Sequence, residues 1–224
     1  MTDADGYDVT VKEISPTEYI FKMPASKVTV EAEFVKTPET STLPYNDVDV
    51  DDWFYGAAEY AYNNGIMSGM GATQFAPNIN LSRAMLAQIL YNMESGTPVS
   101  SAQFADVVAG AWYADAVNWA AANGTVGGYG DGISGPEINI SREQIAVILY
   151  RYASYKGYNV STKGDLSAFT DIDKLSDWAE EAVAWVVGEN VFGGKGKGVL
   201  DPTGLATRAE VAQIFMNFCE NIDK

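Results

Sequence analysis

Three arginines occupy equivalent positions in three short, similar stretches of the sequence. The stretches read LSRAMLAQIL, ISREQIAVIL and ATRAEVAQIF, and their arginines are Arg83, Arg142 and Arg208. A Ser or Thr precedes each arginine and is a typical helix N-cap, which places the arginine in the first helical turn. A cation is disfavoured there, because a helix N-terminus carries about half a positive charge. A guanidinium group offers two parallel donors that match a carboxylate, so the pattern indicates an anionic ligand.

The alternative is that each arginine is half of a structural ion pair. Carboxylates that could serve are Asp47, Asp106, Asp171, Glu143 and Glu210. A surface ion pair contributes only ~0–1 kcal/mol, whereas a charge-assisted contact to a carboxylate ligand contributes roughly 1.5–3 kcal/mol. We therefore expect at least one arginine to bind a ligand. On this interpretation, Arg208→Lys keeps the melting temperature and weakens ligand binding.

These stretches belong to a longer internal repeat. A Trp stands 16 residues before a Gly in each copy, and that Gly stands 14 residues before the Arg, with a Pro eight residues after the Gly. The tryptophans are Trp53, Trp112 and Trp178, and the glycines are Gly69, Gly128 and Gly194. Landmarks that keep register three times predict three copies of one structural unit.

Each unit is predicted to be a helix, a Gly-rich loop and a second helix. Trp53, Ala57, Tyr60 and Ala61 have the spacing of one apolar helix face, and the other units repeat it. The stop signals are Asn64-Gly65, Asn123-Gly124 and Asn190, and the second helices begin at Ser82, Ser141 and Thr207. Gln144 and Glu210 can close capping boxes, but Met85 cannot. The tryptophans are interpreted equally well as core anchors of the first helix or as ligand contacts.

One unit is too small to bury both of its helices, so we expect a single all-α body with pseudo-threefold character from about Asp47 to Asn221. Before it, residues 28–34 alternate as a half-buried strand does, and Tyr7–Val11 and Tyr19–Phe21 are two further strand candidates. The expected division is a β segment over 1–36, a linker over 37–44, and repeats over 45–98, 99–160 and 161–224.

Composition excludes several function classes. The net charge is −16 and histidine is absent, which argues against nucleic acid and anionic membrane surfaces as partners. No apolar run approaches the ~20 residues that span a bilayer, so no membrane insertion is predicted. Met1 is followed by polar residues, which indicates a piece of a longer protein without its signal peptide. No metal site or cofactor is predicted, and the lone Cys219 is expected to be a small buried hydrophobe.

The repeated frame resembles the S-layer homology (SLH) domain of bacterial surface proteins. The resemblance is carried by FADV and FTDI, the Trp-headed first helix, the Gly-x-Gly-x-Gly at 128–132 and the TRAE at 207–210, and it covers about Tyr45 to Phe218. The segment YIFKMPASKVTVEAEF is similar to the end of a small extracellular bacterial β-repeat. The implied fold is mainly α, three helix-loop-helix repeats in a three-pronged spindle, preceded by a short β segment.

The resemblance implies non-covalent anchoring of an exported protein to the cell wall. The implied ligand is an anionic, pyruvylated secondary cell-wall polysaccharide, and the location is extracellular, at the cell surface. Carried over by position, the implied ligand contacts are Arg83, Arg142, Arg208, Gly69, Gly128, Gly194, Trp53, Trp112 and Trp178, to which we add Asp47, Asp106 and Asp171. Repeat 1 departs most from the motif, so substituting Arg83 is expected to weaken binding least.

Two other functions remain open at this point. The same spindle could mediate protein–protein contacts and self-association in a surface array without binding sugar. An enzyme, such as a glycosidase with paired carboxylates, is the less favoured alternative, because no carboxylate pair stands apart from the repeat pattern.

Overall fold

The computed structural model describes residues 5, 8–15, 18–23, 25, 27, 41–99 and 104–223, and the chain divides into the units Met1–Glu39 and Thr40–Lys224. In the first unit, β1 (Val11–Ser15) pairs antiparallel with β2 (Glu18–Phe21), and Val11 lies opposite Phe21. The predicted strand at 19–21 is confirmed. Of the predicted strand at 7–11, Val11 begins β1 and residues 8–10 precede it, whereas Tyr7 lies outside the described residues. The strand predicted at 28–34 lies outside the described residues.

The second unit is mainly helical, as the sequence predicts. Its α-helices are α1 (Tyr55–Asn63), α2 (Arg83–Met93), α3 (Ala114–Ala122), α4 (Arg142–Lys156), α5 (Glu180–Gly188) and α6 (Arg208–Asn221). Two short 3₁₀ helices, η1 (Ile172–Lys174) and η2 (Asp177–Ala179), precede α5. Each repeat therefore contributes a short first helix and a longer second helix, joined by the Gly-rich loop.

The predicted helix boundaries of the second helices are confirmed by their caps. The side chains of Ser82, Ser141 and Thr207 accept hydrogen bonds from backbone N–H groups three residues later. Reciprocal capping boxes form with Gln144 and Glu210, and repeat 1 has the single cap expected from Met85. The first helices stop where Gly65, Gly124 and Asn190 adopt positive φ of 67°, 68° and 55°.

The tryptophans at the head of each repeat are not part of the first helix. Trp53, Trp112 and Trp178 precede α1, α3 and the first turn of α5, and their side chains are 66%, 61% and 59% exposed. The interpretation of these residues as core anchors is therefore wrong. The buried faces are built instead by residues one to two turns later, namely Ala57, Ala61, Ala116, Trp119, Ala120, Ala182, Trp185 and Val186.

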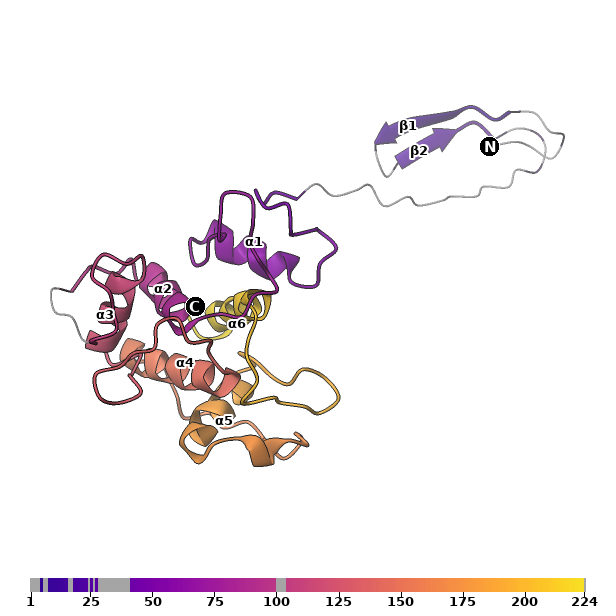
Figure 1. Cartoon of the computed structure of the whole chain (residues 1–224). Helices are drawn as coiled ribbons and strands as arrows, with labels where there is room; N and C mark the ends of the chain where they lie inside the picture. Colours follow the sequence, from indigo (N-terminus) through magenta and orange to yellow (C-terminus); the bar gives the residue numbers. More distant parts are fainter. Residues whose placement is uncertain are drawn as a thin grey trace. The chain divides into compact units, whose positions relative to one another are not determined.

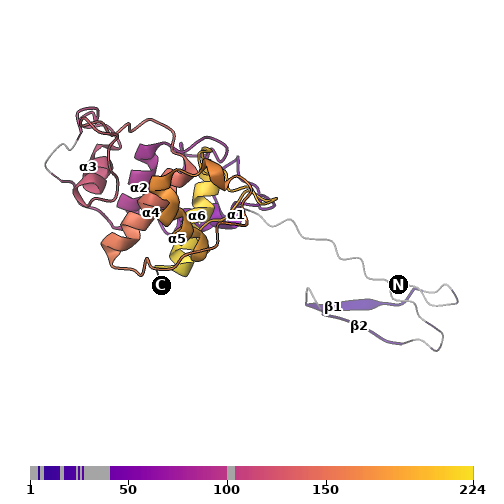
Figure 2. The same ribbon diagram turned by 90° about the horizontal axis from the view of Figure 1, so that it is seen from below.

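The three repeats form a closed ring. The second helix of each repeat packs against the first helix of the next: α2 on α3, α4 on α5, and α6 back on α1. At the centre, Leu81 N–H donates to the carbonyl of Ala206 at 2.9 Å, and Ile140 N–H donates to that of Leu81 at 2.9 Å. Figure 1 shows α1, α3 and α5 on three separate sides of α2, α4 and α6. Figure 2 shows the same unit from below, with α3 and α1 at its opposite ends. The order of contacts gives the threefold character that the repeats predict.

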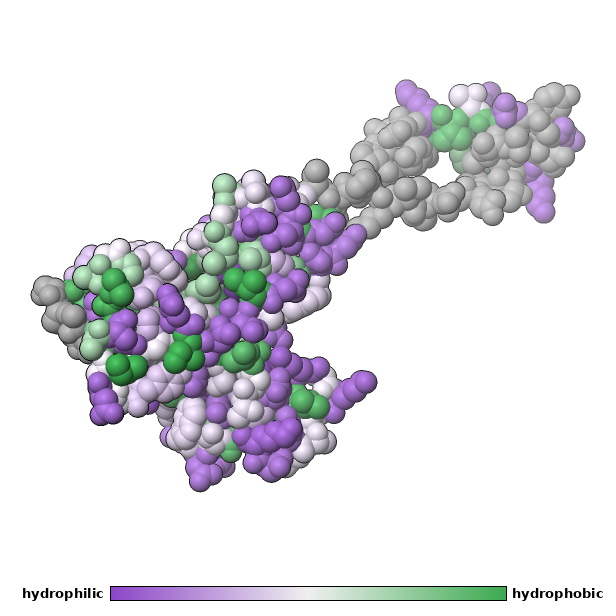
Figure 3. All heavy atoms as spheres, viewed as in Figure 1, coloured by the Kyte–Doolittle hydropathy of each residue, from purple (hydrophilic) through white to green (hydrophobic). Residues whose placement is uncertain are grey.

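The surface of the helical unit is mostly hydrophilic on the face shown in Figure 3, with hydrophobic residues in separate patches. The core lies inside, where Leu86, Leu90, Ile145, Leu149 and Phe215 are fully buried on the second helices. These core side chains are therefore shielded from solvent. The candidate ligand-binding residues lie elsewhere, where one repeat meets the next.

Candidate ligand-binding grooves

Each of the three arginines reaches from its own repeat into the Gly-rich loop of the following repeat. Arg83 donates from Nε to the carbonyl of Ser134 at 2.9 Å and from Nη2 to that of Gly127 at 2.5 Å. Arg142 donates in the same way to Leu200 at 3.0 Å and Gly193 at 2.6 Å. Arg208 closes the ring by donating to Phe75 at 2.8 Å and Ser68 at 2.6 Å in repeat 1.

These contacts explain how a cation is accommodated in the first turn of a helix. The three arginines are only 4–6% exposed, and two carbonyl oxygens of another repeat face each guanidinium. Each guanidinium also lies over an aromatic ring, at 4.5 Å from the centroid of Tyr129 for Arg83, 5.0 Å from Phe192 for Arg142 and 4.9 Å from Phe75 for Arg208. Burial lowers the pKa of all three groups.

The predicted alternative of a structural ion pair is not found. Within the described ranges, no carboxylate lies within 4.0 Å of any of these three guanidinium groups, and the ion pairs there involve lysines. Glu143 is instead used by Ser176, whose N–H and Oγ both donate to it at 3.1 Å. The arginines thus cross-link the repeats. Among the residues that the structure describes, no carboxylate forms an ion pair with their guanidinium groups. That at least one also binds a ligand stays a prediction.

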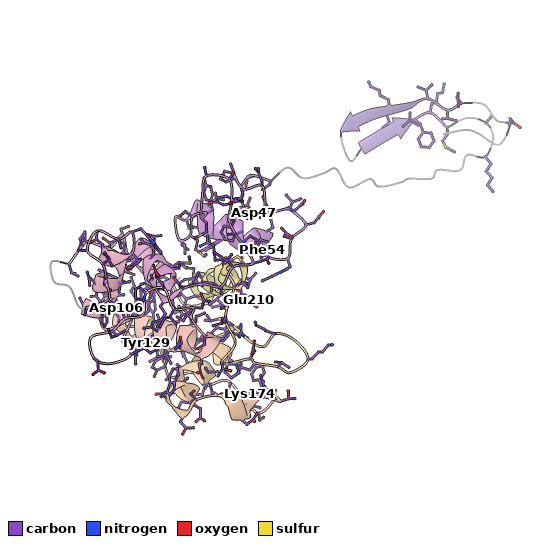
Figure 4. The ribbon with its side chains drawn as sticks, viewed as in Figure 1. Asp47, Phe54, Asp106, Tyr129, Lys174 and Glu210 are labelled. Carbon is purple, nitrogen blue, oxygen red and sulfur yellow. The ribbon has the colours of Figure 1, made fainter. Side chains whose placement is uncertain are left out.

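The carboxylates that open the repeats hold the same loops from the other side. Asp47 accepts from the N–H groups of Phe75 and Ala76, both at 2.8 Å. Asp106 accepts from Ser134 and Gly135 at 2.8 and 2.7 Å. Figure 4 shows Asp47 and Asp106 in separate arms of the helical unit.

The third carboxylate makes the equivalent contacts. Asp171 accepts from the N–H groups of Leu200 at 2.8 Å and Asp201 at 2.9 Å. The hydrogen bond from Leu200 N–H is the main reason that the pKa of Asp171 is lowered. Burial raises the pKa of Asp106, but the N–H groups of Ser134 and Gly135 outweigh it and the net pKa is lowered. The loop residue whose N–H binds the Asp is also the one whose carbonyl binds the Arg. A ligand contact by these three carboxylates remains an untested prediction.

The glycines at 69, 128 and 194 are required by close packing. A Cβ on any of them would lie closer than 3.0 Å to a loop carbonyl oxygen, that of Gln74, Ile133 or Val199. The same Cβ would press on the ring of Tyr45, Phe104 or Phe169, the aromatic residues just before the opening Asp. These glycines let the loop fold back on itself, and through it they shape the cavity walls.

Two cavities lie where the repeats meet, and each is built by all three repeats. The cavity that we call groove 2 has a volume of about 210 Å³ and contains Arg83 of repeat 1 and Trp178 of repeat 3. The rest of its lining comes from repeat 2: Gly127, Gly128, Tyr129, Gln144, Val147, Ile148 and Arg151. Figure 4 labels Tyr129, which lies in the same arm as Asp106.

The cavity that we call groove 1 has the same arrangement, centred on repeat 1 instead of repeat 2. Its volume is larger, at about 570 Å³. Arg208 comes from repeat 3 and Trp112 from repeat 2, whereas loop residues 66–70 and α2 of repeat 1 form its floor and wall. The structure thus brings together a predicted Arg, Gly and Trp in each groove, but from three different repeats. Arg83, assigned by its sequence position to repeat 1, lines groove 2.

The equivalent position in repeat 3 is occupied by charged side chains of the protein. Lys195 stands where Tyr129 stands in repeat 2, and its Nζ lies 3.2 Å from Glu210 and 3.3 Å from Asp201. Glu210 in turn corresponds to Gln144. Groove 1 contains Trp112 and groove 2 contains Trp178. By the same order of repeats, the third position corresponds to Trp53 and Arg142. The three positions are therefore unequal, but the one set apart by the structure is that of repeat 3 and not that of Arg83, which the sequence singles out. Which arginine contributes least to binding stays an untested prediction.

Several groove residues are absent from the set predicted by sequence, chiefly Tyr129, Gln144 and Arg151. They lie in positions where the three repeats differ, and alignment on the shared landmarks does not select such positions. In the described part of the chain, no group of three or more Cys, Asp or Glu residues could hold a metal ion. None of its helices is both long and apolar enough to cross a membrane.

Comparison with known proteins gives a consistent family match. The family model described as "S-layer homology domain" matches residues 44–85, 103–146 and 168–212. The chain is 32% identical over 184 residues to an exoglucanase XynX from Acetivibrio thermocellus, covering 80% of this chain and 16% of that protein. It is 28% identical over 190 residues to a surface-layer 125 kDa protein from Lysinibacillus sphaericus, covering 83% and 16%.

A third relative is a cellulosome-anchoring protein from Acetivibrio thermocellus, 38% identical over 98 residues, which cover 43% of this chain and 21% of that protein. The chain thus spans about a fifth or less of the length of these relatives.

Proposed function

The chain belongs to the S-layer homology family, and we propose that it anchors a surface protein to the cell wall by binding an anionic, pyruvylated polysaccharide. Family membership makes it an extracellular, cell-wall-associated module. The polysaccharide, its pyruvyl groups and the residues that bind it are the proposal. One observation carries it: groove 2 places a buried guanidinium, two exposed aromatic side chains and the backbone of Gly127–Gly128 around one cavity.

A pyruvylated sugar offers the two features that such a cavity suits. Its carboxylate can accept from a guanidinium, and Nη1 is the nitrogen of Arg83 that the loop carbonyls do not use. The apolar face of a sugar ring can lie on Tyr129 or Trp178, which are 50% and 59% exposed. Groove 1 supplies the same combination through Arg208 and Trp112.

Charge requires that this binding be local. At a net charge of −16 the protein as a whole repels an anionic polymer, and salt screens that repulsion beyond ~8 Å at physiological ionic strength. Binding then depends on short-range contacts within each groove. Two grooves on one rigid ring can engage one polymer together and gain avidity through effective concentration.

The relatives favour a binding module over a catalytic one. One is named an exoglucanase, one a surface-layer protein and one an anchoring protein, yet the matched segment is a small fraction of each. We propose that this chain is non-enzymatic and that it supplies the shared attachment function. Self-association in a surface layer is a further part of the proposal, supported by the surface-layer relative.

The test is co-sedimentation of the chain with purified wall polymer before and after chemical removal of pyruvyl groups. We expect binding that is lost with the pyruvyl groups and weakened in Trp178→Ala, whose side chain is exposed and contributes little to the core. Tyr155→Ala, which removes a 46% exposed aromatic outside both grooves, is the matched control. Binding that survives removal of the pyruvyl groups would refute the pyruvylated ligand, and absence of binding to the intact polymer would favour the protein–protein function instead.

A further inference from the structure

One position on the second helix differs between repeats in a way that changes the groove. Asn92 in α2 and Asn217 in α6 donate from Nδ2 to the loop carbonyls of Ile66 and Val191, at 3.1 and 3.0 Å. Each Asn is oriented by a glutamine one turn earlier: Gln88 donates to Asn92 at 2.8 Å and Gln213 to Asn217 at 2.9 Å. In repeats 1 and 3 this position therefore fastens the loop to the helix.

Repeat 2 has Val147 and Arg151 at these two positions, and the fastening is absent. Both residues line groove 2. Nη1 of Arg151 lies 3.1 Å from the point that a Cβ on Gly127 would occupy, so the guanidinium sits against the loop backbone beside the cavity. Within the described residues no carboxylate lies within 4.0 Å of it. Arg151 thus has no structural partner of opposite charge there.

Groove 2 consequently contains two guanidinium groups in one cavity. Their like charges repel each other, and an anion bound between them would relieve that repulsion. The pKa of Arg83 reflects this, because burial lowers it most, Tyr129 raises it, and the charge of Arg151 lowers it further. Groove 1 has Asn92 at the position of Arg151 and also Glu137 in its lining, so it offers one guanidinium and one carboxylate. The chain has only four arginines, and two of them meet in groove 2.

We propose that groove 2 binds a saccharide that carries two anionic groups, with Arg83 binding one and Arg151 the other, whereas groove 1 accepts a singly charged unit. The proposal rests on the function proposed above and makes Arg151 its specificity-determining residue. The second anionic group is a phosphate on the same sugar.

The test uses two probes on the ¹⁵N-labelled chain: the methyl glycoside of a pyruvylated N-acetyl amino sugar, with one anionic group, and the corresponding 1-phosphate, with two. The indole N–H signals of Trp178 and Trp112, assigned with Phe substitutions, report groove 2 and groove 1 separately. We expect the Trp178 signal to titrate about tenfold more tightly with the 1-phosphate than with the methyl glycoside. The Trp112 signal is expected to show no such preference.

Arg151→Asn, which installs the residue of the other two repeats, is expected to remove the tenfold preference, so that the 1-phosphate binds no more tightly than the methyl glycoside. Lys163→Asn removes the same charge from an exposed ion pair outside both cavities and should keep the preference. Arg151→Gln repeats the test if the Asn variant does not fold. A wild-type ratio near one, or a preference that survives both Arg151 changes, overturns the inference while methyl glycoside binding still supports the anchoring function. Failure of both probes to move the Trp178 signal overturns the inference about groove 2, and failure to move the Trp112 signal as well overturns the anchoring proposal too.

Discussion

At the scale of single residues, the three arginines show how a motif that predicts ligand binding can also have a structural role. Nε and Nη2 of Arg208 are used by the carbonyls of Phe75 and Ser68, more than 130 positions away in sequence. Sequence reasoning offered a carboxylate ligand or a carboxylate partner for this cation. It did not include backbone carbonyls of a different repeat, because no local pattern encodes which loop the side chain reaches.

This geometry changes the expectation for Arg208→Lys. A lysine keeps the charge but cannot serve two carbonyls with a planar fork. We expect a loss of roughly 1–2 kcal/mol in the free energy of unfolding. For a chain of this size that lowers the melting temperature by about 2–4 °C per kcal/mol. Thermal unfolding followed by circular dichroism measures it. Arg151→Lys is the control, since Arg151 is not one of the inter-repeat cross-links, and an unaltered melting temperature in Arg208→Lys would contradict the cross-linking role.

The exposed tryptophans mark a second limit of sequence reasoning at this scale. Trp53 has the right spacing for the buried face of α1, yet the helix begins two residues later and the side chain points to solvent. Periodicity gives the face of a helix but not the residue at which the helix begins, and no capping side chain marks the start of α1. Arg151 was missed for a different reason, since only a comparison of unlike positions between repeats reveals it.

At the scale of elements, the second helices and their loops were the best predicted parts. Thr207 and Glu210 form the capping box that their spacing indicates, and Met85 leaves repeat 1 without one. Caps and left-handed stop residues act within four or five positions, so the sequence specifies them locally. The contacts between the loop of one repeat and the arginine of another depend on how helices pack, and that information is not local.

The Gly-rich loop is expected to tolerate alanine at one glycine and not at its neighbour. In Gly194→Ala the new methyl group would meet the carbonyl of Val199 and the ring of Phe169, so the loop must open. Gly193→Ala is the matched control, because nothing lies within 4 Å of its Cβ position. We expect a loss of about 1–3 kcal/mol of stability for Gly194→Ala, of the order seen for overpacking, and little for Gly193→Ala. Chemical denaturation of both variants measures the difference, and equal stabilities would refute the packing argument.

The loop-holding carboxylates predict how stability depends on pH. The pKa of Asp106 is lower in the folded protein than in an unfolded chain, where it is about 3.9. Its contribution is therefore complete above about pH 4 and is lost as the pH falls through the folded value. Urea midpoints at pH 6 and pH 3 should show lower stability at pH 3.

Asp106→Asn should be less stable than the wild type at pH 6 and should lose less on acidification. A wild-type midpoint that rises between pH 6 and pH 3, or a variant with the full acid dependence, would show that this carboxylate does not hold the loop.

At the scale of the whole helical unit, the closed ring distinguishes this protein from an open repeat array. In an open array, terminal repeats can unfold before the others. Here α6 packs on α1, and Arg208 donates to the loop of repeat 1, so each repeat has two neighbours. We expect hydrogen exchange from α2, α4 and α6 of the full chain to report one common opening free energy. Earlier opening of one repeat, with the other two still protected, would contradict the ring.

The composition of the grooves also bears on how such a protein can arise by gene duplication. A complete groove takes its arginine from one repeat, its loop and helix from the next and its tryptophan from the third. A single ancestral repeat would have had such a groove only as a homotrimer, and a two-repeat intermediate would have had none within one chain. In a chain of three fused repeats each copy can diverge separately, and a substitution at a groove position in one repeat alters a site whose other walls belong to the other two repeats.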